Sequence, residues 1–180
     1  MWKKCWWLQV VKSGNNWLFN VVLSTLERKV AFLGEHTVKI DAKGRMRLPG
    51  GLKQQMKPEN KGRFVVNRGF ESCLEIYPID VWEKVRARIE RLNQFKKKER
   101  SFIRYFMRGA TEVVLDGQDR LNLPKHLLEY AGITGEAILT PGKNTLELWD
   151  SKRYEAELNI SSDNFADLAE DVLGDLSVDE

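Results

Sequence analysis

The sequence contains few residues of the kinds that form disulfide frameworks or metal centres. Its 180 residues include two cysteines, Cys5 and Cys73, and two histidines, His36 and His126. Side chains so few and so widely spread are insufficient for a disulfide framework or a clustered metal site. We therefore expect a chain from a reducing cytoplasm that uses no metal and no cofactor.

Long hydrophobic runs are also missing. A membrane-spanning helix needs about 20 mostly apolar residues in succession, and no stretch of the chain approaches that length. The N-terminal segment MWKKCWWLQVVKSGNN has lysines ahead of a short apolar run, but Lys12 interrupts the run before it reaches the length of a signal peptide. We expect neither secretion nor a membrane partner.

The sequence lacks the motifs of common enzyme classes. It has no phosphate-binding P-loop, no G-x-S-x-G, no H-E-x-x-H and no Asp-Thr/Ser-Gly. Asp41 and Asp116 occupy equivalent places in two similar segments, which would suit paired-carboxylate chemistry, but each has an arginine four residues later. An adjacent arginine lowers the pKa of a carboxyl instead of keeping it protonated, so we expect no enzymatic activity.

What the sequence does contain is charge that changes sign along the chain. Residues 1–30 carry 5 basic and 1 acidic residues, residues 31–160 carry 24 and 18, and residues 161–180 carry 0 and 7. A basic body indicates a polyanionic partner. The acidic end indicates a solvated tail, which could compete with that partner for the basic surface. Ordinary surface charge is the simpler alternative.

Two segments of the chain repeat one pattern. VKIDAKGRMRLPGGL (38–52) matches VVLDGQDRLNLPKHL (113–127), and the similarity continues between residues 64–82 and 137–154. Each copy has the pattern of a strand-rich unit, so we expect an α+β fold, mainly β, with internal pseudo-twofold symmetry. The expected order is an N-terminal extension (1–30), repeat one (31–80), a basic helical connector (81–108), repeat two (109–158) and an acidic C-terminal tail that begins with a helix (159–180).

The connector between the repeats has the pattern of a helix. Its apolar residues recur at helical spacing from Val81 to Phe106. Asp80, with Glu83 three residues later, resembles a capping box at its start. The basic residues of Arg86–Arg100 form either a solvated face or a second anion-binding surface, and we favour the solvated face.

Each copy of the repeated pattern predicts a hairpin. In the first copy, apolar residues alternate with charged ones along Val38–Leu48, which is typical of two strands with one solvated face. The second copy predicts strands over 113–116 and 120–123. The loops should place Gly44 and Asp119 in the left-handed region, which glycine adopts freely and aspartate tolerates.

A proline follows each hairpin. Pro49 and Pro124 should end the strands and lead into short helices over residues 51–57 and 125–130. Gly132 should end the second of these helices.

The two hairpins place an aspartate opposite an arginine. Asp41 should pair with Arg45, and Asp116 with Arg120, and such a pair can simply stabilise the turn. The first hairpin has more positive charge than one aspartate balances, which favours a contact with DNA in which arginines reach guanine edges and lysines meet phosphates. Both interpretations can hold together. The expected DNA-binding residues are Lys39, Asp41, Lys43, Arg45, Arg47, Asp116 and Arg120.

Several short motifs together resemble the bacterial MraZ family. They occur in the same order and spacing and cover about residues 31–158. They are Phe32-Leu-Gly-Glu-His36, Asp41-Ala-Lys-Gly-Arg45 with Leu48-Pro49, Cys73-Leu-Glu-Ile-Tyr-Pro78, Arg120-Leu-Asn-Leu-Pro124 and Leu128-Glu-Tyr-Ala-Gly132.

The resemblance implies a transcriptional regulator built from two AbrB/SpoVT-like swapped-hairpin units that together form a small β-barrel. Its implied partners are further copies of itself in a ring and double-stranded promoter DNA with repeated short sites, and its implied location is the nucleoid. The implied target is the promoter of the division and cell-wall gene cluster, including its own promoter, with repression as the outcome. The family's DNA-contacting motif falls on Asp41, Arg45, Asp116 and Arg120.

Two regions depart from the family pattern. The second loop has Gly117-Gln-Asp119 where the first has Ala42-Lys-Gly44, so it is less basic. Residues 1–30 precede the usual start near Phe32; an upstream start codon would account for them, and their tryptophans would be either disordered or packed against a neighbour. An alternative function is an antitoxin or scaffold module whose 161–180 segment binds a protein.

Overall fold

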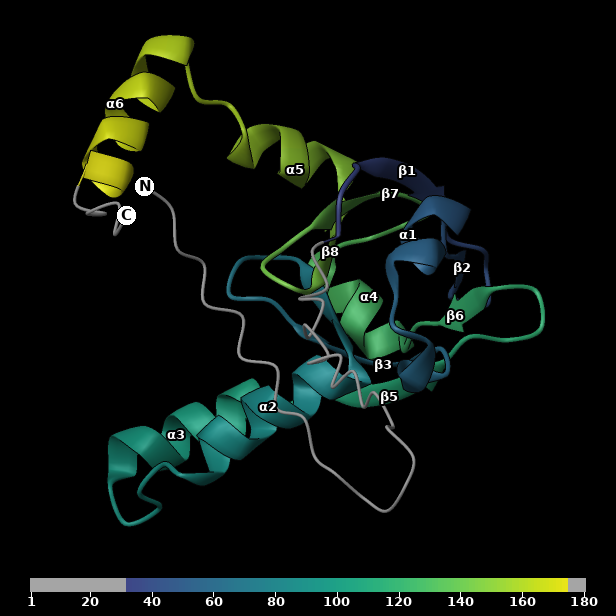
Figure 1. The fold of residues 1–180 in the computed structure, drawn as a ribbon, viewed down its shortest axis with the longest axis horizontal. Coiled ribbons are helices and arrows are strands. Elements are labelled where there is room, and N and C mark those ends of the chain that lie inside the picture. The colour runs from purple at the N-terminus through teal and green to yellow at the C-terminus, as the bar shows by residue number, and fades with distance from the viewer. Residues whose placement is uncertain (1–31, 175–180) are drawn as a thin grey trace, which may run out of the picture.

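The computed structural model describes residues 32–174 of the chain (Figure 1). In that range the chain forms eight strands and six α-helices, so the expected α+β fold, mainly β, is confirmed. None of these helices is long and apolar enough to cross a membrane. Expectations about the extension (1–30) and about residues 175–180 concern parts of the chain outside the described residues.

The helices and strands follow the repeat pattern. The first repeat contains β1 (His36–Lys39), β2 (Arg45–Arg47), α1 (Gly50–Gln55), a 3-10 turn (Pro58–Asn60), β3 (Arg63–Arg68) and β4 (Leu74–Pro78). Between the repeats lie α2 (Ile79–Glu90) and α3 (Lys97–Phe106). The second repeat contains β5 (Thr111–Val114), β6 (Arg120–Asn122), α4 (Lys125–Ala131), β7 (Glu136–Pro141), β8 (Leu146–Asp150) and α5 (Ser151–Glu157), and α6 (Ser162–Gly174) follows.

The two repeats exchange strands. The larger sheet has the order β1-β7-β8-β4-β3-β5, and a smaller sheet pairs β2 with β6. Every pairing is antiparallel, and the first strand of each repeat lies beside the hairpin of the other: β1 pairs with β7 and β5 with β3. Neither repeat therefore completes its sheet without the other.

The exchange changes the expected hairpins. Beyond the turn, the first hairpin retains one bridge between its arms, from Ile40 to Met46. The arms then separate, because β1 continues along β7 while β2 pairs with β6. The alternating pattern correctly predicted which side chains are buried, and the arms pair mainly with strands of the other repeat, as the swapped-hairpin resemblance implies.

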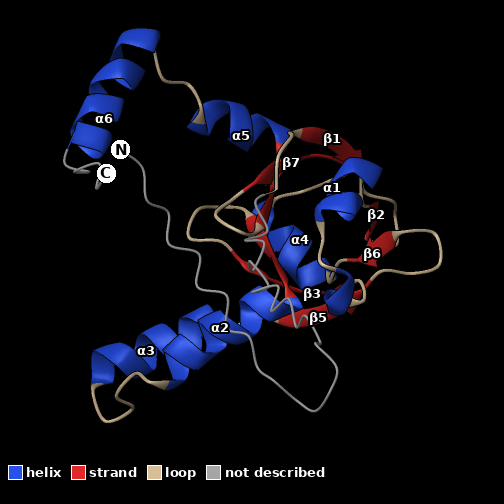
Figure 2. Ribbon diagram, viewed as in Figure 1, coloured by secondary structure: helices blue, strands red, loops and turns tan. Residues whose placement is uncertain are grey.

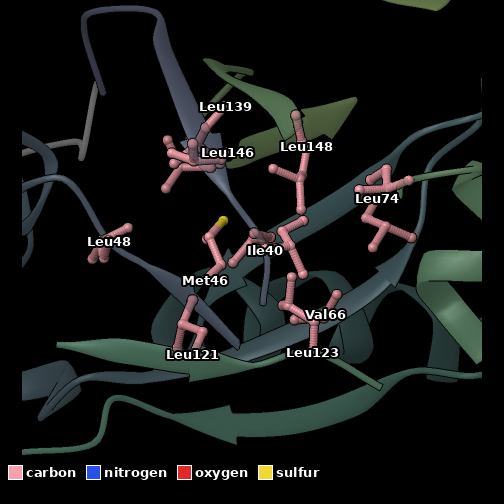
Figure 3. Packing of buried hydrophobic residues seen from close by; sticks show 14 of the residues in the cluster. Ile40, Met46, Leu48, Val66, Leu74, Leu121, Leu123, Leu139, Leu146 and Leu148 are labelled. Carbon is pink, nitrogen blue, oxygen red and sulfur yellow. The ribbon is translucent and has the colours of Figure 1, made fainter. Parts of the chain in front are cut away.

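The main core lies between the two sheets. Met46 on β2 and Leu121 on β6 point inward and are fully buried. They pack with leucines from the larger sheet, such as Leu146 and Leu148 on β8 (Figure 3). Burying a side chain of this size contributes about 1.5 to 3 kcal/mol to folding, so the small sheet is attached to the large one mainly by apolar contact.

The other face of the large sheet is covered by helices (Figure 2). Trp82 at the start of α2 stacks on Phe106 at the end of α3, with ring centroids 6.0 Å apart, so the two helices run antiparallel. The connector is therefore helical as predicted, but it is a pair of helices. On the second repeat, Tyr154 of α5 packs against Trp149 with ring centroids 6.0 Å apart.

The predicted capping box at the start of α2 is wrong. The N-cap residue is Pro78, and no side chain caps the helix. Asp80 lies inside the first turn, where its carboxylate accepts hydrogen bonds from Lys57 at 3.0 Å and from Asn60 at 2.9 Å. Its role is to attach the 3-10 turn to α2, in a position where the helix dipole also favours an acidic residue.

The local geometry expected around the prolines is confirmed. Pro49 and Pro124 immediately precede α1 and α4. Gly132 follows α4 in the left-handed region with φ 70°, and Asp119 is left-handed with φ 60°.

Two glutamates meet at the centre of the large sheet. Glu75 on β4 lies directly opposite Glu147 on β8. The Glu75 oxygen Oε2 is buried and has no hydrogen-bond partner within residues 32–174. Burial, followed by the nearby charges of Glu147 and Glu71, raises the pKa of Glu75 to about 7.

This pair makes stability depend on pH near neutrality. The folded chain keeps the Glu75 proton up to about pH 7, while an unfolded carboxyl loses it near pH 4.5, so stability falls as pH rises through this window. Glu75→Gln should remove the fall and, because the carboxyl is partly exposed to solvent, stabilise the protein by only about 1 kcal/mol at pH 8. At pH 4 the variant should match the parent. Urea unfolding across this range measures the difference.

Glu112→Gln provides a control of opposite sign. The hydrogen bond from Arg63 lowers the pKa of Glu112, so this carboxylate adds stability above its unfolded pKa and loses it as pH falls. Glu112→Gln should therefore weaken the protein at pH 8 and not at acid pH. If Glu75→Gln also weakened it at pH 8, the like-charge interpretation would be wrong.

The two hairpin loops are held by the opposite repeat. The carbonyl of Gly44 accepts a hydrogen bond from the Leu123 amide at 2.8 Å, and the carbonyl of Asp119 accepts one from the Leu48 amide at 2.9 Å. Gly44 has φ +78°, as predicted, and a Cβ at this position would lie 2.7 Å from the Leu123 oxygen. Glycine is thus required both by its backbone angle and by the close approach of the other repeat.

Gly44→Ala should destabilise the protein by about 1 to 3 kcal/mol, because it combines backbone strain with a backbone clash. Gly117→Ala, in the second loop, is the matched control: an added Cβ there meets no atom within 4 Å and its φ is not left-handed. Its effect should stay within about 0.5 kcal/mol. Equal unfolding midpoints in urea for the two variants would contradict the assigned role of Gly44.

Candidate nucleic-acid interface

Each hairpin loop is built around an aspartate. Asp41 Oδ1 accepts hydrogen bonds from the amides of Lys43 and Arg45, both at 2.9 Å. Asp41 Oδ2 accepts from Arg45 Nε at 2.7 Å and lies 2.6 Å from Arg45 Nη2. The expected ion pair is therefore present, and the same carboxylate also fixes the backbone of the turn.

The second loop has the same geometry. Asp116 Oδ1 accepts from the amides of Gln118 at 2.8 Å and Arg120 at 2.9 Å. Asp116 Oδ2 accepts from Arg120 Nε at 2.8 Å, and its distance from Arg120 Nη2 is 2.7 Å. Both arginines are thus held with a defined orientation before any ligand arrives.

The two aspartates remain ionised at any ordinary pH. The side-chain hydrogen bond from Arg45, together with the Arg45 amide, lowers the pKa of Asp41 to about 2. Arg120 does the same for Asp116, whose pKa is also about 2. The predicted lowering is confirmed, and neither carboxyl is available as a proton donor near neutral pH.

The exchange of strands brings the two arginines onto one surface. In the β2–β6 ribbon, Met46 lies opposite Leu121, and both point into the core. The alternate residues point outward: Arg45 lies opposite Asn122, and Arg47 lies opposite Arg120. We call these four outward side chains the ribbon face.

The ribbon face carries unbalanced positive charge. Arg47 lies directly opposite Arg120, and like charges in this relation repel. Asp116 binds Arg120, whereas within residues 32–174 no acidic side chain pairs with Arg47. A polyanion placed against this face would remove the repulsion.

The remaining predicted residues surround the ribbon face. Lys39, at the end of β1, lines a groove together with Arg47 and Asp119. Lys43 lines a second groove, in which Asp41 and Asn122 also lie. The structure therefore brings all seven predicted residues to one end of the molecule, with five cations against two carboxylates.

Two residues of this region were not predicted. Asn122 occupies in repeat two the place of Arg47 in repeat one, and its amide can both donate to and accept from a base edge. Lys53 of α1 forms a 2.6 Å ion pair with Asp119. The alignment of the repeats was enough to find Asn122, but Lys53 gave no local signal because its partner is far along the chain.

The left-handed residue of the second loop is an aspartate and not a glycine. At the equivalent place in the first loop, a Cβ added to Gly44 would lie 2.7 Å from the Leu123 oxygen and 3.4 Å from the Leu128 side chain. In the second loop the left-handed residue is Asp119, whose carboxylate reaches Lys53 of α1 at 2.6 Å. The first loop thus leaves no room for a side chain at this place, whereas the second uses its side chain in an ion pair.

The connector lies away from the ribbon face. Figure 1 shows β2, β6 and their loops at one end of the molecule, with α3 and α6 at the other. The basic surface of α3 is therefore separate from the arginines of the two loops. Among the residues that the structure describes, no group of three or more histidine, cysteine, aspartate or glutamate side chains could hold a metal ion.

Comparison with known proteins identifies the repeats. The family model for MraZ proteins, described as antitoxin-like, matches the chain twice, over residues 31–105 and 106–176. A protein of Christiangramia forsetii named Transcriptional regulator MraZ is 44% identical over 146 residues, covering 81% of this chain and 94% of that protein. Another of the same name, from Flavobacterium psychrophilum, is 38% identical over 149 residues, covering 82% and 95%. The chain therefore belongs to the MraZ family.

Proposed function

We propose that this chain, like its curated relatives, is a transcriptional regulator, and that it acts by binding specific sequences in double-stranded DNA. The observation that carries the proposal is the ribbon face, on which Arg47 and Arg120 lie opposite each other and Asp116 pairs with Arg120 alone. A two-stranded antiparallel ribbon fits the major groove of B-DNA. Phosphates would supply the missing negative charge.

In this proposal the loop residues have distinct roles. Arg45 and Arg120, held by their aspartates, reach the base edges, where arginine can bond guanine O6 and N7 together. Lys39 and Lys43 meet phosphates and fix the position of the ribbon. Asp41 and Asp116 touch DNA little, and act by holding the arginines in the required orientation.

The resemblance to the family supports a more detailed proposal. The target is the promoter of the division and cell-wall gene cluster, including the chain's own promoter, and the outcome is repression. The active form is a ring of identical subunits that reads several copies of a short site. One ribbon neutralises few phosphates, so several ribbons on one assembly would raise the effective concentration at neighbouring sites.

Selection of bound fragments from the genome of the source organism tests this function. A regulator of this kind should enrich a few promoter fragments that share a repeated short element. An antitoxin or scaffold that acts only through a protein partner would enrich no common sequence, and that result would overturn the proposal.

Arg45→Ala should weaken specific DNA binding about ten- to hundredfold, because it removes a base contact from each subunit. Arg120→Ala should cost less, since its loop carries no basic residue. Arg63→Ala is the charge-matched control: Arg63 also pairs with an exposed carboxylate, Glu112 at 2.7 Å, but lies on β3. All three should keep their melting temperature within a few degrees, as measured by calorimetry.

Unchanged affinity for Arg45→Ala, together with lost stability, would limit the Asp–Arg pair to a structural role. An equal loss of affinity in Arg63→Ala would mean that net charge alone, and not the ribbon face, determines binding.

Affinity should also depend on the number and phase of sites. Ribbons on one rigid assembly can enter the same side of a duplex only where major grooves recur, about every 10 to 10.5 base pairs. DNA with one, two or three in-phase copies should bind with steeply rising affinity, and inserting half a turn between copies should abolish the gain. Fluorescence anisotropy at several salt concentrations measures both effects. Equal affinity for single and repeated sites would exclude the multivalent mechanism.

A further inference from the structure

Helix α6 has an apolar stripe that no other part of residues 32–174 covers. Phe165, Leu168 and Val172 follow one another at intervals of three and four residues, so they lie along one face of the helix. Their side chains are 63%, 48% and 59% exposed. Three large apolar side chains in a row on an exposed helix indicate a binding surface.

Helix α3 has a second exposed apolar surface. Phe102 and Tyr105, three residues apart on α3, are 42% and 60% exposed, and Phe70 beside them is 76% exposed. The rings of Phe70 and Phe102 rest on that of Phe106, with centroids 6.4 and 5.7 Å away, so the surface is firmly supported from below. We call Phe70, Phe102 and Tyr105 the aromatic patch.

The charges around these two surfaces are opposite. The connector, residues 81–108, carries 10 basic and 3 acidic residues, whereas residues 159–180 carry no basic and 7 acidic residues. The net charge therefore has the same size in the two segments and the opposite sign. The segment that carries the stripe and the connector that carries the second surface therefore attract each other through their net charges.

The two surfaces lie apart within one chain. Figure 1 shows α6 at the upper left and α3 at the lower left of the view, well apart. Residues 158–161 connect α5 to α6, and four residues span at most about 14 Å. The partner that best suits the aromatic patch is thus α6 of another copy.

We propose that α6 of one copy packs its apolar stripe on the aromatic patch of a second copy, and that the opposite net charges of the two segments draw them together. Because the stripe and the patch are different surfaces of the same chain, the contact is head-to-tail, which closes into a ring when the rotation allows it. The contact deepens one part of the proposed function, the ring of subunits. It does not depend on the ribbon face, which lies at the other end of the molecule.

Crosslinking between full-length chains tests the contact directly. The background carries Cys5→Ser; Cys73 is buried and burial raises its pKa to about 12, so it does not compete. Ser101→Cys, beside the aromatic patch, is mixed with a differently tagged Ala169→Cys, beside the stripe, and treated with a short bismaleimide. Asp167→Cys, on the opposite face of α6, replaces Ala169→Cys in the control. Both substitutions at 101 and 169 leave the aromatic patch and the stripe intact.

We expect crosslinks between the two tagged chains, at least tenfold more for Ala169→Cys than for Asp167→Cys. Equal yields would overturn the proposal. In a further test one chain carries both Ser101→Cys and Ala169→Cys and is diluted with protein that lacks them. Crosslinks that then form only within single chains would also overturn the proposal.

A second measurement follows assembly. Phe165→Ser with Leu168→Ser in the full chain should raise the concentration at which sedimentation shows half-assembly by tenfold or more, without changing the melting of dilute protein. Leu158→Ser with Ile160→Ser is the control, since these exposed apolar residues precede α6 and lie outside the stripe. Unchanged assembly of the stripe variant would overturn the contact, even with DNA binding intact. If the parent chain forms the crosslink but binds no DNA, the proposed function is overturned and the contact between copies is not.

Discussion

The pairing of β2 with β6 is the interaction on which the other features depend. It joins strands from different repeats and is attached to the large sheet by fully buried side chains, including Met46 and Leu121. Because successive residues on a strand face opposite sides, burying these two forces Arg45, Arg47 and Arg120 outward together. The hydrogen bonds at Gly44 and Asp119 then fix each loop against the opposite repeat. The core and the candidate site are thus consequences of one pairing.

Features that depend on near neighbours in the sequence could be predicted. The left-handed residues Gly44 and Asp119 and the Asp–Arg pairs all arise within a few residues, so residue type and spacing were enough. The choice of partner strand was different. The alternating pattern of Val38–Leu48 suits pairing within the hairpin as well as pairing across the repeats, and only the family resemblance indicated the exchange.

The errors have a similar cause. Asp80 fits a capping box by spacing, but Pro78 takes the N-cap position and leaves Asp80 to bind Lys57 and Asn60. Lys53 was missed because its partner, Asp119, is distant in sequence and close only after the repeats have come together. Contacts of this kind depend on how distant segments align in the folded chain, which the local pattern of each segment does not show.

The pseudo-twofold relation has one more consequence. Its axis passes between Met46 and Leu121 on the ribbon and, on the far side of the core, between Glu75 and Glu147, since equivalent residues of the two repeats are paired at both places. Any residue on such an axis must face its own counterpart. Two apolar side chains satisfy that condition, but two acids cannot neutralise each other. Their repulsion is relieved only when one copy has diverged or when one carboxyl keeps its proton. Duplication therefore imposes its greatest electrostatic cost on the few positions nearest the axis.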